Sequence, residues 1–161
     1  MNQVQRISIL SKLGGIMRLI GEEGVWPGNK IGITEDEFKN LEDLIKQVHI
    51  YNGWFTEKSV REAFLGIGQW LQKEELTNWV KEYNTQQVNS KSVAIIMAGN
   101  IPLVGFHDFL AVFLSGNKAV VKLSSDDKHL FPAIITLLSL FDPEINNWVE
   151  IKENKLEILM L

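Results

Sequence analysis

Apolar residues recur at two different spacings along this chain. In the first half they fall at steps of three and four, as in Ile7, Leu10, Leu13, Met17 and Ile20. That spacing places the side chains on one face of a helix. Similar patterns continue to about residue 89. The first 89 residues are therefore expected to form a helical N-terminal region.

Capping residues mark where two of these helices begin. Thr34 and Glu37 stand three positions apart before an apolar run, which is the spacing of a capping box. Thr56 can cap the next helix, and a further helix is expected around Leu76 to Tyr83. The paired glycines at 14 and 15 weaken the first helix without forbidding it.

From residue 90 the sequence pattern changes to short apolar runs rich in β-branched residues. Strands are expected at residues 92–98, 118–123 and 147–153, and helices at 104–114, ended by Gly116, and from Ser124 or Ser125 to about Phe141. Pro132 requires that last helix either to start late or to bend. The alternation predicts an α/β class, with a parallel βαβαβ unit at residues 90–161.

The last residues lack a polar tail. The chain ends on the apolar stretch LEILML, and three parallel strands normally need neighbours and cover on both faces. We therefore expect residues 90–161 to be the truncated start of a domain. Exposed strand edges and apolar patches should make the isolated chain self-associate, as a homo-oligomer or less specifically.

Composition removes several classes of function. The chain of 161 residues has a net charge of -4, and its lysines are interleaved with acids, so a nucleic-acid partner is not expected. It has no cysteine, which excludes disulfides, thiolate metal sites and a cysteine nucleophile within these residues. The three histidines, His49, His107 and His129, do not have metal-ligand spacing.

No segment of the sequence resembles a targeting or membrane element. No uninterrupted apolar run reaches the roughly 18 to 20 residues that span a bilayer, so no membrane span is expected. The N-terminus lacks the basic start and small-residue cleavage site of a signal peptide. These features favour a cytoplasmic protein.

Candidate chemistry lies where the first two expected strands end. In an open α/β sheet, ligands bind at the carboxyl ends of the strands. Gly99 and Asn100 follow the first strand, and they offer close backbone approach and a neutral amide donor. Lys122 ends the second strand, and Ser124 and Ser125 would then stand at a helix N-terminus, which favours anions. Taken alone, these residues could equally be a turn asparagine, a solvated lysine and helix caps.

Two stretches, IIMAGNIPL and SGNKAVVKLSS, resemble the aldehyde dehydrogenase superfamily. That superfamily has a turn of the type P-W-N-F-P, a helix, and then G-N-x-V-V-x-K-P-S-E. The similarity is closer to its acyl-CoA reductases of the bacterial luminescence type, and the NGWFT stretch also fits. The resemblance covers most of the chain and is sharpest at residues 93–128. It implies that the α/β region is the start of a Rossmann-like cofactor-binding domain.

The resemblance also implies roles for single residues. Asn100 matches the asparagine whose amide stabilises the oxyanion of the covalent intermediate. The cofactor-binding positions that it implies are Ala98, Gly99, Lys122, Ser124 and Ser125. Lys122 matches the lysine that binds the adenosine ribose. Ser125 replaces a glutamate that many relatives use to hold the 2′-hydroxyl, which favours NADPH, with NADH as a usable alternative. Two positions depart from the pattern, Gly99 for tryptophan and Leu123 for proline.

The implied reaction is reduction of a fatty acyl-CoA, or another acyl thioester, to an aldehyde. In the family a cysteine takes the acyl group and the nicotinamide then delivers hydride. That cysteine is absent from these residues. The alternatives are a non-catalytic binding or assembly subunit of the same fold, or a related acyl-phosphate reductase.

Overall fold

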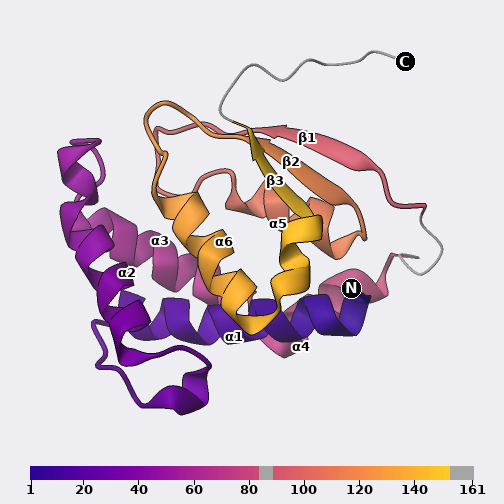
Figure 1. The fold of residues 1–161 in the computed structure, drawn as a ribbon, viewed down its shortest axis with the longest axis horizontal. Helices are drawn as coiled ribbons and strands as arrows, with labels where there is room; N and C mark the ends of the chain where they lie inside the picture. Colours follow the sequence, from indigo (N-terminus) through magenta and orange to yellow (C-terminus); the bar gives the residue numbers. More distant parts are fainter. Residues whose placement is uncertain (84–88, 153–161) are drawn as a thin grey trace.

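A computed structural model describes residues 1–83 and 89–152 and shows helices followed by a small parallel sheet (Figure 1). The elements are α1 (Gln3–Gly21), α2 (Glu35–Gln47), α3 (Glu57–Trp70), α4 (Lys73–Lys81), β1 (Ser92–Ile96), α5 (Phe106–Leu114), β2 (Lys118–Lys122), α6 (Leu130–Phe141) and β3 (Val149–Lys152), with short 3-10 turns η1 (Asn29–Ile31), η2 (Val48–Ile50) and η3 (Pro143–Asn147). The expected α/β class is confirmed. The apolar stretch LEILML and the boundary near residue 89 fall at or beyond the edges of the described residues, so the domain division stays a prediction.

The expected caps are present. Thr34 Oγ1 accepts a hydrogen bond from Glu37 N at 3.2 Å, and Glu37 Oε2 accepts one from Thr34 N at 2.7 Å, which completes a capping box. Thr56 Oγ1 accepts from Ser59 N at 3.1 Å at the start of α3. Each bond satisfies a backbone N–H that has no partner within its own helix. These starts are therefore set by local sequence.

Helix α1 lies against α3, and the two helices approach closely at Gly14. A Cβ built at Gly14 would lie 2.6 Å from the Cβ of Leu71, closer than packed carbon atoms come. Arg18 Nη1 donates a hydrogen bond to the carbonyl oxygen of Gly68 at the same crossing. The glycine that weakens α1 as a helix therefore allows the tight helix contact that buries Leu10 and Leu13.

The sheet has the order β1-β2-β3 with all strands parallel, and helices cover one of its faces. The covered face carries Ile95, Val121 and Ile151 in register, of which Val121 is fully buried. In Figure 1 the helices lie on one side of the strands. Ile96, on the opposite face, is 68% exposed. Within residues 1–83 and 89–152, that second face therefore has no covering helix.

The uncovered face carries an ion-pair cluster across β2 and β3. Lys118 Nζ lies 2.7 Å from Glu150 Oε2, and Lys152 pairs with the other carboxylate oxygen of Glu150. The hydrogen bond from Lys118, with that from Lys152, lowers the pKa of Glu150 to about 2. The alternation of the strands thus places Ile95, Val121 and Ile151 toward the helices, and the Lys118, Glu150 and Lys152 ion pairs on the other face, beside Ile96.

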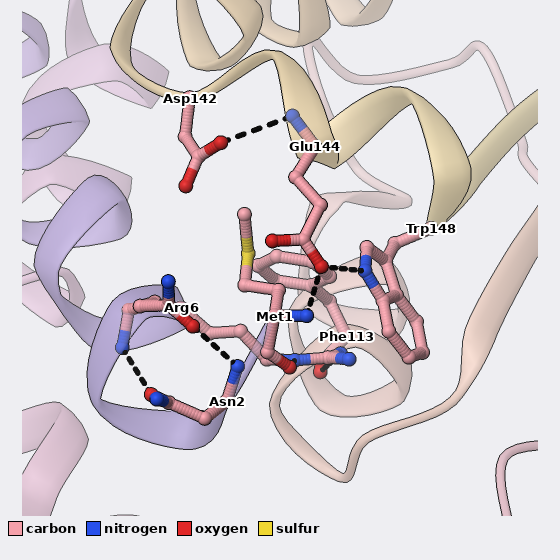
Figure 2. Close-up of polar contacts among 8 residues, drawn as sticks. Met1, Asn2, Arg6, Phe113, Asp142, Glu144 and Trp148 are labelled. Carbon is pink, nitrogen blue, oxygen red and sulfur yellow. Dashed lines mark hydrogen bonds and ion pairs between the residues drawn. The ribbon is translucent and has the colours of Figure 1, made fainter.

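A buried arginine ties the N-terminal end of α1 to the sheet unit (Figure 2). The guanidinium carbon of Arg6 lies 3.9 Å from the ring centroid of Trp148 and 4.7 Å from that of Phe113. Arg6 Nη1 also donates to the carbonyl oxygen of Phe113, at the end of α5. Burial lowers the pKa of Arg6 to about 10, although the charge of Glu144 opposes the shift. The two aromatic faces and the carbonyl stabilise a cation that is only 2% exposed.

The expected start of α6 at Ser124 or Ser125 is wrong. The helix begins at Leu130, so that Pro132 lies in its first turn, where a backbone N–H is not needed. Asp127 Oδ1 accepts a hydrogen bond from Leu130 N at 3.2 Å, while Ser124 pairs with Asp127 in an isolated antiparallel bridge. Of the two readings of Pro132, the late start is confirmed. Ser124 and Ser125 therefore do not stand at a helix N-terminus, and the anion site expected there on that ground is wrong.

Candidate functional site

The turns that follow β1 and β2 meet at the carboxyl edge of the sheet, where a third segment joins them. Asn52 Nδ2 donates hydrogen bonds to the carbonyl oxygens of Gly99, at 3.2 Å, and Asp126, at 3.1 Å. The Asn52 side chain is buried, so its amide holds both turns in a site screened from water. The expectation that the two turns share one edge of the sheet is confirmed.

The segment that carries Asn52 is itself fixed by local bonds. Asn52 Oδ1 accepts a hydrogen bond from Trp54 N at 3.0 Å, which closes an Asx turn. Phe55 N donates to the carbonyl oxygen of Asn52 at 2.9 Å, and the Phe55 side chain is fully buried. Thr56 then caps α3. The loop is therefore anchored on both sides, while Trp54 projects into solvent.

Gly99 allows the two turns to pack against each other. A Cβ built at Gly99 would lie 2.4 Å from Ser124 Oγ and 2.8 Å from Ser124 Cβ. Any larger residue would push the turn after β2 away, because these distances are shorter than packed atoms tolerate. Ser124 Oγ in turn accepts from Asp126 N at 3.2 Å. Gly99 thus allows close packing against Ser124 and Asp126, whose Cβ would lie 2.9 Å away, and its expected close approach to a ligand stays a prediction.

A second buried side chain, that of Asp127, ties the same two turns together. Burial raises the pKa of Asp127, while hydrogen bonds from backbone groups of Leu130, Leu103 and His129 oppose the rise. Leu103 lies in the turn between β1 and α5 and has a positive φ of 56°, which is uncommon for a residue with a side chain. Such strained backbone persists only where its surroundings fix it, and Asp127 is one of the groups that do so.

A cavity of about 650 Å³ opens at this junction. It is lined by Tyr51, Asn52, Gly53, Trp54, Gly99, Asn100 and Asp126. Asn100 is exposed, and in residues 1–83 and 89–152 no hydrogen bond occupies its side-chain amide. An asparagine that served the turn alone would be expected to bond its own backbone, as Asn52 does. The amide of Asn100 is therefore available to a ligand in the cavity.

The structure brings together only some of the residues expected to bind a cofactor. Gly99 and Asn100 line the cavity, and exposed Ala98 precedes them. Lys122 accepts a hydrogen bond from Met97 N through its carbonyl oxygen at 3.0 Å, but its side chain shares the uncovered sheet face with Ile96. The described cavity wall does not include Lys122. Lys122 is the last residue of β2, and its expected contact with a cofactor stays a prediction.

The exposed side chain of Ser125 has an acidic neighbour. Ser125 Oγ lies 3.3 Å from Asp126 Oδ1, so a carboxylate stands next to the position where relatives carry a glutamate. This carboxylate belongs to the cavity wall. NADPH is expected because Ser125 carries no negative charge that would repel the 2′-phosphate. The neighbouring Asp126 carboxylate does carry such a charge, which weakens that expectation.

His107 and Asp108 do not form an acid–base pair. The His107 ring stacks on Trp79, with 5.6 Å between centroids, and meets the edge of Trp70 at 5.9 Å, beside a cavity of about 500 Å³ between α3, α4 and α5. Asp108 is exposed and does not line that cavity. His107 therefore packs against two tryptophan rings, whereas Asp108 faces solvent. In the described part of the chain, no three His, Cys, Asp or Glu residues are grouped as metal ligands would be.

Sequence reasoning did not identify Asn52 or Asp127 as parts of the site. Asn52 bonds partners 47 and 74 positions away, which no local pattern reveals. The only available signal for Asn52 was the NGWFT stretch. Asp127 belongs to the SSDD run, where the two serines looked like the better caps.

The fold and the cavity together define an α/β protein with a cavity at the carboxyl ends of parallel strands, the place where ligands bind in open α/β sheets. The family model described as acyl-CoA reductase (LuxC) matches residues 34–151, and the chain belongs to this family of oxidoreductases. No curated protein and no solved structure shows significant similarity to the chain. No helix in the described residues is long and apolar enough to cross a membrane.

Proposed function

We propose that this chain supplies the Asn100 side of the active site in an NADPH-dependent reductase of fatty acyl thioesters, within the aldehyde dehydrogenase superfamily. The observation that carries the proposal is the side-chain amide of Asn100, which makes no hydrogen bond within residues 1–83 and 89–152 and is held at the cavity by the buried Asn52 clamp. Acyl transfer to a thiolate and its reduction both place negative charge on one carbonyl oxygen. A fixed neutral donor stabilises that charge as it develops.

The other residues of the site fix the position of Asn100 and bind the cofactor. Asn52 and Asp127 keep the turns after β1 and β2 in one arrangement, so the Asn100 donor needs little reorganisation. Lys122 offers three N–H donors at the end of β2, which suits ribose hydroxyl groups. Ser125, three positions later, offers a hydroxyl group. Bound NADPH would supply hydride, in the Rossmann-like arrangement that the resemblance implies for this sheet.

The nucleophile of this reaction has to come from outside these 161 residues, because they contain no cysteine. The thiolate would attack the thioester carbonyl, form an acyl-enzyme and release coenzyme A as a thiol. Hydride addition to the acyl-enzyme would then release the aldehyde and return the thiolate. The absence of cysteine also favours a second candidate, a non-catalytic binding or assembly subunit. A third, an acyl-phosphate reductase, would share the same acyl-enzyme.

Aldehyde formation is the test. The protein made from its native reading frame should convert an acyl-CoA and NADPH into aldehyde, oxidised cofactor and free coenzyme A in equal amounts, measured by gas chromatography, absorbance and a thiol reagent. An acyl phosphate run in parallel separates the two reductase candidates by kcat/KM. Cofactor oxidation without aldehyde, or no turnover with either acyl donor, would favour the assembly subunit.

Cofactor choice should respond to charge beside Ser125. Ser125→Glu adds a carboxylate near the proposed ribose site, so it should shift the NADPH-to-NADH ratio of kcat/KM toward NADH by about tenfold, or about 1.4 kcal/mol. Asp126→Asn removes the neighbouring charge with little change of shape and should shift the same ratio toward NADPH. If both ratios stay at the wild-type value, the 2′-phosphate does not lie near Ser125.

A further inference from the structure

Two exposed aromatic side chains line the Asn100 cavity, and further exposed apolar residues lie close to cavity residues in the sequence. Eleven large apolar side chains of the described residues are exposed, and five of them fall within residues 50–54 and 101–104. These five are Ile50, Tyr51, Trp54, Ile101 and Val104. Trp54 is 84% exposed and Tyr51 61% exposed, and both line the cavity with Asn100. Clusters of this kind mark binding surfaces, whereas single exposed apolar residues do not.

The cavity wall is divided between polar and apolar groups. Asn100 and Asp126 provide an amide and a carboxylate, while Trp54 and Tyr51 provide two large rings. The carbonyl of a fatty acyl thioester suits the Asn100 amide, which is a donor, and the hydrocarbon chain suits the two rings. An oxyanion donor fixes where the carbonyl oxygen must lie. The hydrocarbon chain of the substrate then has to extend from the carbonyl along the apolar part of the cavity wall.

We propose that Trp54 and Tyr51 bind the hydrocarbon chain of the acyl substrate and so set the chain-length preference of the enzyme. This inference rests on the proposed function and adds the residues that recognise the chain. Covering the Trp54 ring with methylene groups would remove apolar surface of both partners from water, which contributes on the order of 0.8 kcal/mol per buried methylene.

The backbone of Trp54 and the ring of Tyr51 are held in place before any substrate binds. The backbone N–H of Trp54 is bonded to Asn52 Oδ1, and the next residue, Phe55, is anchored in the core. The Tyr51 ring lies 4.0 Å from the His129 ring, centroid to centroid. A loop that is already ordered loses little backbone entropy on binding. Trp54 is therefore exposed on a fixed loop, as a contact surface for a ligand would be.

A chain-length series tests this proposal. The protein made from its native reading frame would be assayed with saturated acyl-CoA substrates of four to sixteen carbons. In the wild type kcat/KM should rise with length by about two- to fourfold per added methylene, until the apolar wall is covered. In Trp54→Ala the loss should grow with chain length and reach about 10- to 100-fold for long chains, equivalent to about 1.4 to 2.7 kcal/mol. Tyr51→Ala should show a smaller loss of the same form.

Trp70→Ala is the matched control, because Trp70 is a half-exposed tryptophan beside the separate His107 cavity. It should keep the wild-type profile. A loss in Trp54→Ala that is equal for all chain lengths would overturn the proposal. So would a loss that coincides with a change in oligomeric state by light scattering, because Trp54 would then contact a second copy.

A binding measurement separates this proposal from the proposed function. S-dodecyl-coenzyme A, a thioether that cannot be reduced, would be titrated into the same variants by calorimetry. Weaker binding to Trp54→Ala than to Trp70→Ala supports the chain-binding wall even if the wild type makes no aldehyde. Equal affinities of the two variants would contradict the proposal that Trp54 binds the hydrocarbon chain. They would not contradict a reductase activity of the protein.

Discussion

Replacing Asn100 by alanine is expected to lower kcat for aldehyde formation by about 100- to 1,000-fold. The amide acts on charge that develops only in the reaction, so KM for the acyl-CoA and the affinity for NADPH should change little. The melting temperature should also stay close to that of the wild type, since no described residue accepts a bond from the Asn100 side chain. Steady-state kinetics and thermal unfolding of the same preparation provide the measurement.

The opposite result identifies Asn100 as a turn residue. Alanine would then cost stability on the order of 1 kcal/mol and leave the rate of aldehyde formation nearly intact. Asn40→Ala, at an exposed position of α2 far along the chain from the cavity, is the matched control and should change neither quantity. Asn100→Asp keeps the shape but adds negative charge, so it should be at least as inactive as the alanine variant.

The elements that sequence predicts well are those fixed by neighbouring residues. The capping box of Thr34 and Glu37 involves two residues three positions apart, and the strands around Ile95 and Val121 are apolar runs bounded by turns. Gly116 takes a positive φ of 87° after α5, as expected for a glycine that ends a helix. Each of these features depends on residues that lie only a few positions apart in the sequence.

The parts that sequence does not predict depend on distant partners. Asn52 becomes a clamp only because two turns from other elements arrive beside it. Pro132 and Asp127 together move the start of α6 past the two serines, although either serine alone is a good cap. The buried arginines Arg6 and Arg61 look like surface residues in the sequence, because only tertiary structure supplies their partners.

Arg61 joins three helices through one guanidinium group. From α3 it donates to the carbonyl oxygen of Ile20 on α1 at 2.7 Å and to both carboxylate oxygens of Glu42 on α2, at 3.0 and 2.8 Å. It also pairs with Glu57, one turn earlier on α3, at 2.8 Å. The Arg61 side chain is only 8% exposed. Bidentate bonds to carboxylate in such a place are strong and depend on geometry.

Arg61→Met should lower the free energy of unfolding by about 2 to 3 kcal/mol, because it removes the charge-assisted bonds to Glu42 and leaves that carboxylate with Lys46, at 3.8 Å, as its partner. Urea unfolding at neutral pH measures the change. Arg61→Lys keeps the charge but cannot bind both oxygens, so it should lose less. Adding Glu42→Gln to Arg61→Met should recover part of the loss, since it removes a partly buried carboxylate that then has a weaker ion pair, with Lys46. An Arg61→Met protein as stable as the wild type would show that the ion pair contributes nothing net.

The same arginine should set part of the dependence of stability on pH. Hydrogen bonds from Arg61 are the largest cause that lowers the pKa of Glu42. A carboxylate with a lowered pKa in the folded state stabilises the protein fully above its unfolded pKa, and that stabilisation is lost as pH falls through the folded value. In the wild type the free energy of unfolding should therefore decrease from about pH 5 downward, partly because of Glu42. In Arg61→Met the carboxylate loses its donor, so this part of the slope should flatten or reverse. A slope unchanged by the substitution would mean that Glu42 titrates alike in both proteins, and that the guanidinium does not hold its charge.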